Sequence, residues 1–164
     1  MSLYDRRALR NAFGSFMTGV TVVTARTNTG IPVGFTANSF TSVSLDPPLL
    51  LVCPSKSLSS YDAFASCSHF AINVLEARQK DISDIFAGDH EDRFAKVPHR
   101  TDALDLPLIT NALAQFSCAT EQRVEAGDHL VLIGRVKAFS HSDGTGLGYA
   151  GGRYFNLNDT PIPA

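Results

Sequence analysis

The segment of residues 54–60 has a composition suited to binding phosphate. Four hydroxyl groups and one cation surround the start of a predicted helix, in the run Pro54-Ser55-Lys56-Ser57-Leu58-Ser59-Ser60. The first backbone N–H groups of a helix are unpaired and lie at the positive end of its dipole, so they attract phosphate. Arg93 could add a second positive charge for the same phosphate. The same residues also fit a serine-rich cap and a lone surface arginine that bind no ligand.

A predicted strand over residues 33–40 carries a second group of polar side chains. Thr36 and Asn38 fall on one face of this strand, because side chains alternate along a strand. A hydroxyl and an amide beside main-chain groups can match the donors and acceptors along the pyrimidine edge of a flavin. A half-solvated strand with its polar residues turned outward would have the same pattern.

Two motifs near the end of the chain indicate a function only when they are considered together with these segments. Gly127-Asp128-His129 fits a tight turn, and Gly152-Arg153-Tyr154 fits the start of a strand. The glycine-rich run of residues 144–148 resembles a dinucleotide-binding loop, but no convincing helix follows it, which favours a flexible turn.

Several common catalytic signatures are absent from the sequence. It has no G-x-x-x-x-G-K-[ST] phosphate loop, no H-E-x-x-H zinc helix and no G-x-S-x-G nucleophile elbow. Its five histidines lack metal-ligand spacing, so we expect no metal site. Cys53, Cys67 and Cys118 lie beside apolar or small residues without C-x-x-C spacing, which predicts buried, reduced thiols.

Length and composition indicate one globular domain over residues 1–164. The net charge of −2 gives no overall attraction to nucleic acid or to an anionic membrane. No apolar run reaches the roughly 20 residues of a membrane helix. Charged residues from Asp5 to Arg10 interrupt any signal peptide, so we expect a cytoplasmic protein.

The predicted elements are mostly short strands. Capping spacing between Ser2 and Asp5 starts a first helix, with Leu9, Phe13, Phe16 and Met17 on one face and Gly19 at its end. Two more helices are predicted over residues 58–66, with Ser57 as N-cap, and over residues 77–87. Strands are predicted over residues 20–25, 33–40, 49–53 and 69–75, and residues 114–124 and 129–139 form a hairpin. The stretch of residues 88–107 is polar and irregular. Few helices between many short strands favour a mainly β, closed or nearly closed antiparallel barrel over a doubly wound α/β fold.

Taken in order, several stretches resemble the short-chain flavin reductase family, the reductase partners of two-component flavin-dependent monooxygenases. The resemblance runs from about Phe13 to Leu157. The matching stretches are Met17-Thr18-Gly19-Val20-Thr21-Val22-Val23-Thr24, Gly34-Phe35-Thr36-Ala37-Asn38-Ser39-Phe40-Thr41-Ser42-Val43-Ser44, Asp46-Pro47-Pro48, Phe70-Ala71-Ile72-Asn73-Val74-Leu75, Asp92-Arg93-Phe94, Gly127-Asp128-His129 and Gly152-Arg153-Tyr154. Each stretch alone is weak evidence for the resemblance, but all of them in this order and spacing would rarely occur together by chance.

The resemblance implies a split β-barrel with a Greek-key core, a few peripheral helices and a homodimer whose flavin sites lie near the subunit interface. The residues implied to face the isoalloxazine ring are Thr36, Ala37, Asn38 and Ser39, with Ser42, Val43 and Ser44 nearby. Those implied to hold the ribityl-phosphate end are Cys53, Pro54, Ser55, Lys56, Ser57, Ser59 and Ser60, assisted by Arg93. His129 and Tyr154 would help to seat the nicotinamide, although Gly151-Gly152 departs from the tyrosine-rich stretch often found before this motif.

The implied reaction is hydride transfer from NADH or NADPH to FMN or FAD, with the reduced flavin leaving for a partner monooxygenase. His129 is the catalytic candidate, in the role of orienting the nicotinamide. Two other readings stay open. One is a flavoenzyme that retains FMN and acts on another small molecule, and the other is a non-catalytic flavin-binding protein.

Overall fold

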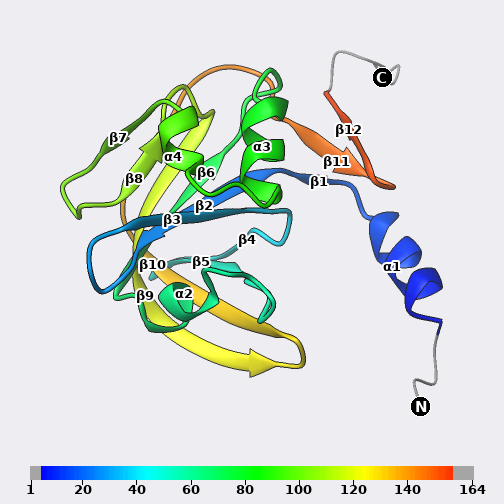
Figure 1. Cartoon of the computed structure of the whole chain (residues 1–164), viewed down its shortest axis with the longest axis horizontal. Helices are drawn as coiled ribbons and strands as arrows, with labels where there is room; N and C mark the ends of the chain where they lie inside the picture. Colours follow the sequence, from blue (N-terminus) through cyan, green and yellow to red (C-terminus); the bar gives the residue numbers. More distant parts are fainter. Residues whose placement is uncertain (1–4, 157–164) are drawn as a thin grey trace.

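The computed structural model describes residues 5–156, and its main element is a seven-stranded sheet in which every neighbouring pair is antiparallel (Figure 1). In the order in which they pair, the strands are β3 (Pro32–Ala37), β2 (Thr21–Arg26), β6 (His69–Val74), β9 (Ala114–Ala126), β10 (His129–His141), β5 (Pro48–Val52) and β4 (Thr41–Leu45).

The sheet must curl into a barrel because its two edge strands are consecutive in the chain. β3 and β4 lie at opposite edges, yet only residues 38–40 connect them. That connection spans at most about 15 Å between Ala37 and Thr41. The edges of a flat seven-stranded sheet would be roughly 29 Å apart. The short connection therefore brings the edges together without pairing them, and the predicted mainly β split barrel is confirmed.

Two small sheets and four short helices surround the barrel. The first sheet contains β1 (Thr18–Gly19), β11 (Gly148–Ala150) and β12 (Arg153–Phe155), and the second contains β7 (His99–Thr101) and β8 (Pro107–Ile109). The helices are α1 (Arg6–Gly14), α2 (Tyr61–Ser66), α3 (Lys80–Ala87) and α4 (Arg93–Lys96). No helix within residues 5–156 has both the length and the apolarity needed to cross a bilayer.

Neither predicted helix start matches the structure. A capping box would make Ser2 the N-cap and Asp5 the third helical residue. Asp5 is instead the N-cap of α1 and accepts a hydrogen bond from the Arg7 N–H at 2.9 Å, while Ser2 lies outside the described residues. The predicted N-cap at Ser57 is wrong, because α2 begins only at Tyr61. The Ser57 N–H instead bonds to the Ser55 hydroxyl at 3.2 Å, which closes a local turn before the helix.

Other element boundaries also differ from the predictions. α1 ends at Gly14, so Phe16 and Met17 follow the helix. β3 ends at Ala37, because the chain leaves this edge to cross to β4. The stretch of residues 88–107 was predicted as irregular but contains α4 and β7, elements of four and three residues that are too short to show a periodic pattern.

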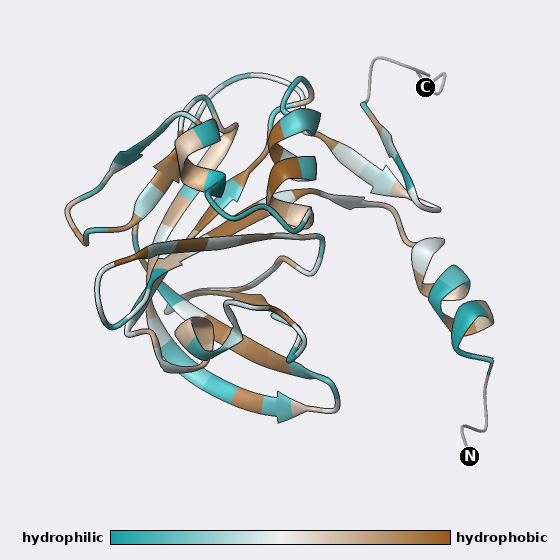
Figure 2. Cartoon of the chain, viewed as in Figure 1, coloured by the Kyte–Doolittle hydropathy of each residue, from teal (hydrophilic) through white to brown (hydrophobic). Residues whose placement is uncertain are grey.

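The core consists of two main apolar clusters. One fills the barrel around Phe64, Phe70 and Leu132, and the other lies around Phe86 and Phe94. Figure 2 shows the apolar residues concentrated on the strands and on α3. Gly134 in β10 allows the first cluster to close, since a Cβ there would lie 2.5 Å from the Phe70 ring.

A buried amide joins the large sheet to β8. Asn73 in β6 is fully buried, and its Nδ2 donates to the Val22 carbonyl at 3.0 Å. Its Oδ1 accepts from the Ile109 N–H at 2.8 Å and from Gln115 Nε2 at 3.1 Å. Since buried polar groups must be paired, this side chain fixes three segments relative to one another.

We expect Asn73→Ala to lower the free energy of unfolding by about 3 kcal/mol, because it leaves the Val22 carbonyl and the Ile109 N–H buried without that partner. Chemical denaturation monitored by circular dichroism measures the change. Gln122→Ala, at an exposed position of β9, is the control and should change the free energy by less than about 0.5 kcal/mol. Equal stability of the two variants would contradict this role for Asn73.

Candidate functional site

The opening between the two sheet edges gathers the polar segments singled out from the sequence. Residues 38–40 cross this opening from β3 to β4. The Cys53 N–H donates to the Ser39 hydroxyl at 3.0 Å, so the end of the Thr36–Ser39 segment touches the start of the 53–60 segment. Two segments that are separate in the sequence thus form one continuous wall.

A cavity of about 320 Å³ lies at the Thr36 end of this wall. Its lining residues come from the residue before β2, the end of β3 and the residue after it, the end of α3 and the small C-terminal sheet. They are Val20, Thr36, Ala37, Asn38, Ala87, Tyr149 and Tyr154. The structure therefore brings Tyr154 together with Thr36, Ala37 and Asn38 around one cavity.

Helix α3 holds the two sides of this cavity together. The Thr36 hydroxyl donates to the Ser83 carbonyl at 2.6 Å. The Ser83 hydroxyl lies 2.9 Å from the Tyr154 hydroxyl, which also donates to Asp84 at 3.2 Å. Lys80 pairs with Asp84 and lies 5.2 Å from the centre of the Tyr154 ring. Ser83 and Asp84 were missed from the sequence, because a serine and an aspartate in a predicted helix carry no signal of this contact.

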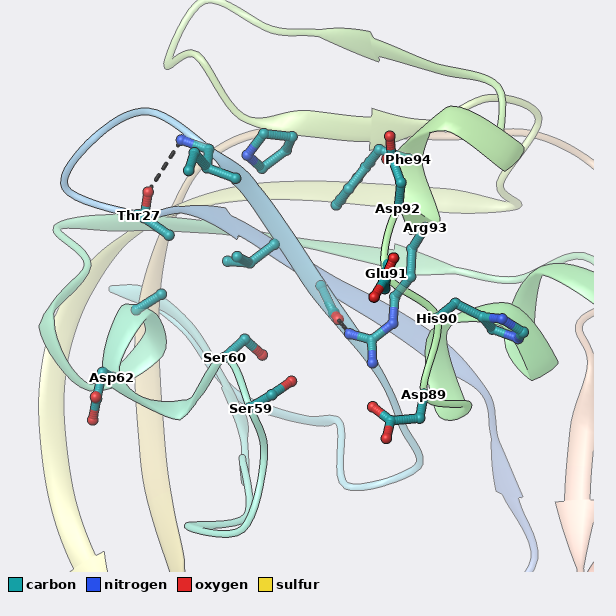
Figure 3. Close-up of a pocket in the computed structure, with 15 residues that line it drawn as sticks. Thr27, Ser59, Ser60, Asp62, Asp89, His90, Glu91, Asp92, Arg93 and Phe94 are labelled. Carbon is teal, nitrogen blue, oxygen red and sulfur yellow. Dashed lines mark hydrogen bonds between the residues drawn. The ribbon is translucent and has the colours of Figure 1, made fainter.

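A larger cavity of about 950 Å³ lies at the other end of the wall. It is bordered by the β2–β3 turn, the start of α2 and the loop from α3 to α4 (Figure 3). Its lining residues are Thr27, Ile31, Pro32, Val33, Gly34, Ser59, Ser60, Asp62, Ala63, Asp89, His90, Glu91, Asp92, Arg93 and Phe94. Of the residues predicted to hold a phosphate, the structure places Ser59, Ser60 and Arg93 here.

The Arg93 guanidinium is partly used by the fold. Its terminal nitrogens donate to the Gly34 carbonyl at 3.0 Å and to the Gly88 carbonyl at 2.8 Å. Its Nε is buried and has no hydrogen-bond partner among the described residues, and the same holds for the Ser60 hydroxyl. Figure 3 shows Ser59 and Ser60 facing Arg93 across the cavity. Buried donors without partners are costly, so this pair is suited to an anionic ligand group.

The remaining residues of the 53–60 segment bind to the tip of the β9–β10 hairpin. The Lys56 N–H donates to the Asp128 carbonyl at 2.9 Å, and the Leu130 N–H donates to the Pro54 carbonyl at 3.0 Å. Lys56 also forms an ion pair with Glu125, whose hydrogen bond raises the pKa of the lysine. The Lys56 ammonium is therefore engaged by the hairpin.

His129 lies beside this segment, where it forms an isolated antiparallel bridge with Ser55. Its Nδ1 is 2.8 Å from Asp128 Oδ1. This hydrogen bond and the charge of the imidazole lower the pKa of the Asp128 carboxyl. The carboxylate can orient the ring. His129 is, however, not among the residues that line the Tyr154 cavity.

The third predicted flavin segment lies on the open edge of the sheet. The pairing of β4 with β5 skips one residue between Ser42 and Ser44, so Val43 forms a bulge. Val43 is 48% exposed, and β4 has no second neighbour in the described sheet. An unpaired edge presents backbone N–H and C=O groups that a planar heterocycle can use.

The cysteines are not placed as nucleophiles. Cys67 and Cys118 are buried and Cys53 is partly buried, and all three are free thiols. Burial raises the pKa of Cys53, and it raises the pKa of Cys118 to about 12. Thiols with raised pKa values are weak nucleophiles at neutral pH. Within residues 5–156, no three His, Cys, Asp or Glu side chains form a group that could hold a metal ion.

We expect the pKa of Asp128 to rise toward its ordinary value in His129→Ala, because the hydrogen bond and the positive charge that lower it are lost. An NMR titration of the carboxyl carbon measures this pKa. His141→Ala, which removes an exposed histidine elsewhere on β10, should leave it unchanged. An unchanged Asp128 pKa in His129→Ala would show that the two side chains do not interact in solution.

Several known proteins with similar sequences are named as reductases or as reductase components. The reductase component of a flavin-dependent trigonelline monooxygenase from Acinetobacter baylyi is 56% identical over 149 residues, covering 91% of this chain and 48% of that protein. The reductase subunit of stachydrine N-demethylase from Rhizobium meliloti is 53% identical, covering 93% of this chain and 66% of that protein. The chain thus spans 48% and 66% of the length of these two relatives. An FMN reductase (NADH) from Agrobacterium fabrum is 44% identical, with 92% and 85% of the two chains covered.

Solved structures agree with this relationship. The NADH:FAD oxidoreductase of Streptomyces globisporus, in complex with NAD and FAD fragments, is 39% identical and superposes with a TM-score of 0.87 over 94% of this chain and 96% of that one. The model of the flavin reductase like domain matches residues 13–158, which include both cavities and the segments that line them. The fold, the relatives and this match together show that the chain belongs to the flavin reductase like domain family.

Proposed function

We propose that this domain catalyses hydride transfer from a nicotinamide cofactor to a flavin. The observation that carries the proposal is the cavity in which Tyr154 meets Thr36, Ala37 and Asn38. The family relationship supports it, since relatives that match most of this chain are named FMN reductase (NADH) and NADH:FAD oxidoreductase.

The described residues fit a bound flavin along the wall between the two cavities. The isoalloxazine ring would lie at Thr36–Ser39, near the open β4 edge with Ser42, Val43 and Ser44. The chain of the flavin would pass Ser39 and Cys53, which are already in contact. Its phosphoryl end would then reach the unpaired donors of Ser60 and Arg93.

When bound, the flavin supplies the acceptor for a hydride from the nicotinamide. The chain's own residues contribute orientation, because two planar rings react only when held close together in the right geometry. Tyr154 is held by Ser83 and Asp84 beside the proposed ring site. His129 is fixed by its bridge to Ser55 and by Asp128, and it would orient the nicotinamide. None of these roles requires a nucleophilic side chain.

The test is oxidation of NADH and NADPH by the purified protein, with FMN or FAD varied from below to far above the enzyme concentration. We expect the rate to saturate only at flavin well in excess of protein, which identifies the flavin as a substrate. If the rate stops rising once there is one flavin per chain and that flavin stays bound, the protein is a flavoenzyme that acts on another substrate. Flavin binding without nicotinamide oxidation would contradict the proposed function.

In the same assay, His129→Ala should raise the KM for the nicotinamide by about tenfold while leaving the Kd for flavin unchanged, because the imidazole is proposed to act only on the nicotinamide. His141→Ala is the matched control and should behave as the wild type. Unchanged kinetics of His129→Ala would remove this residue from the site.

We further propose that the domain forms a homodimer through α1 and the residues that directly follow it, up to Met17. This helix has no buried residue and projects from one side of the barrel with the small C-terminal sheet (Figure 1). Phe13 and Phe16 are 72% and 77% exposed, and Met17 is 65% exposed. Contiguous exposed apolar side chains of this size mark an interaction surface.

Phe13→Ser combined with Phe16→Ser should convert the dimer to a monomer, because it removes most of this apolar surface. Light scattering after size exclusion measures the mass. Phe139→Ser, which is equally exposed on β10, is the control and should leave the dimer intact. A wild-type monomer, or a double variant that remains dimeric, would contradict the use of α1.

A partner for the reduced flavin follows from the relatives. The trigonelline relative is named as the reductase component of a flavin-dependent monooxygenase, and the stachydrine relative as the reductase subunit of an N-demethylase. We propose that this chain likewise supplies reduced flavin to a monooxygenase.

A further inference from the structure

A third cavity lies away from the barrel opening, between the β7–β8 segment and the end of β10. Its volume is about 320 Å³, which is at the lower end of the usual range for ligand sites. None of its lining residues lines either of the two cavities assigned to the proposed flavin site. Any ligand bound here is therefore separate from the flavin.

Two cations in the lining of this cavity have no carboxylate partner. The Arg100 side chain donates to the Gln115 side-chain oxygen at 3.0 Å and makes no other hydrogen bond or ion pair within residues 5–156. Lys137 is exposed, and its ammonium makes neither kind of contact in the same range. Glu121, whose pKa is lowered mainly by its hydrogen bond to Arg135 and also by the charge of Lys137, is already paired with that arginine.

The single carboxylate of the lining is engaged by the fold. Asp102 accepts hydrogen bonds from the N–H groups of Leu104 and Leu106, both at 2.9 Å, and from the Ser117 hydroxyl. These bonds close the turn between β7 and β8. Two cations and one carboxylate leave the lining with one net positive charge. The large cavity has the opposite balance, with four carboxylates and one guanidinium.

Much of the remaining lining is apolar. Leu108 is 3% exposed and Leu104 is partly buried. Phe139 is 73% exposed, yet its ring stacks on that of Phe116 with the ring centres 6.4 Å apart. A phenyl ring that is already held in place loses little freedom when a ligand covers it, and covering it removes apolar surface from water.

We propose that this cavity binds a small monocarboxylic acid with an apolar body. The carboxylate would lie at Arg100 and Lys137, because hydrogen bonds between ionised groups are stronger than neutral ones. The apolar body would lie against Leu104, Leu108 and Phe139. One net positive charge matches a single carboxylate, and the volume suits a ligand much smaller than a flavin or a nicotinamide dinucleotide.

The first experiment is a titration of the purified protein with benzoate, followed by proton–nitrogen correlation NMR. We expect shifts of the backbone amides of Ala103, Leu104, Ala138 and Ser140, with a Kd of about 1 mM or tighter. Benzyl alcohol has the ring without the charge, and inorganic phosphate has charge without the ring. Each should bind at least about tenfold more weakly than benzoate, because each lacks one half of the proposed contacts.

The second experiment repeats the titration with charge-neutral variants. Lys137→Gln should weaken benzoate binding by about fivefold and leave benzyl alcohol unchanged, because only the charge is removed. This exposed side chain makes no hydrogen bond or ion pair within residues 5–156, so the variant should fold normally. Arg100→Gln should weaken benzoate binding at least as much. Lys96→Gln, an exposed lysine outside this cavity, is the matched control and should change neither Kd.

Three outcomes would overturn the proposal. They are equal Kd values for benzoate and benzyl alcohol, unchanged benzoate binding in Lys137→Gln, and shifts confined to the surroundings of Ser60 and Arg93, which would place benzoate in the large cavity. The titration contains neither flavin nor nicotinamide. Its failure would therefore leave the proposed reductase function untouched, and a failure of nicotinamide oxidation would leave this site untouched.

Discussion

The three residues that join β3 to β4 impose the constraint on which the rest of the structure depends. Because these strands are opposite edges of one sheet, the short connection forces the sheet to curl and leaves it open along one line. That line is where Ser39 meets Cys53 and where the bulged β4 edge is free. The proposed flavin site is therefore a consequence of how the barrel is split, and it needs no dedicated binding loop.

Two groups of polar contacts then fix the parts of the site that the sheet does not supply. Helix α3 connects β3 to β12 through Ser83, and the hairpin tip holds the 53–60 segment through Lys56 and Leu130. Both groups join segments that are far apart in the chain. Because hydrogen bonds require specific geometry, they fix the positions of Tyr154 and His129 more precisely than apolar packing alone would.

Lys56 and Arg93, which were predicted to bind a phosphate, also form contacts that hold the fold together. Lys56, whose ammonium suits a phosphate, is paired with Glu125, and Arg93 uses its terminal nitrogens to hold two backbone carbonyls. The Arg93 Nε and the Ser60 hydroxyl are buried and have no hydrogen-bond partner among the described residues.

The sequence by itself determined the mainly β barrel, most of its strands and the family, because alternating apolar patterns and ordered motifs are local properties of the chain. It also singled out Thr36, Asn38, Arg93 and Tyr154 as candidate site residues, and the structure places each of them at one of the two cavities. It misplaced the cap of α2 at Ser57, since a run of serines offers several equivalent starts, and it carried no signal of the contacts that Ser83 makes. Only the tertiary structure decided which polar side chains are engaged by the fold and which face a cavity, because those pairings depend on contacts between residues as far apart as Thr36 and Ser83 or Lys56 and Glu125.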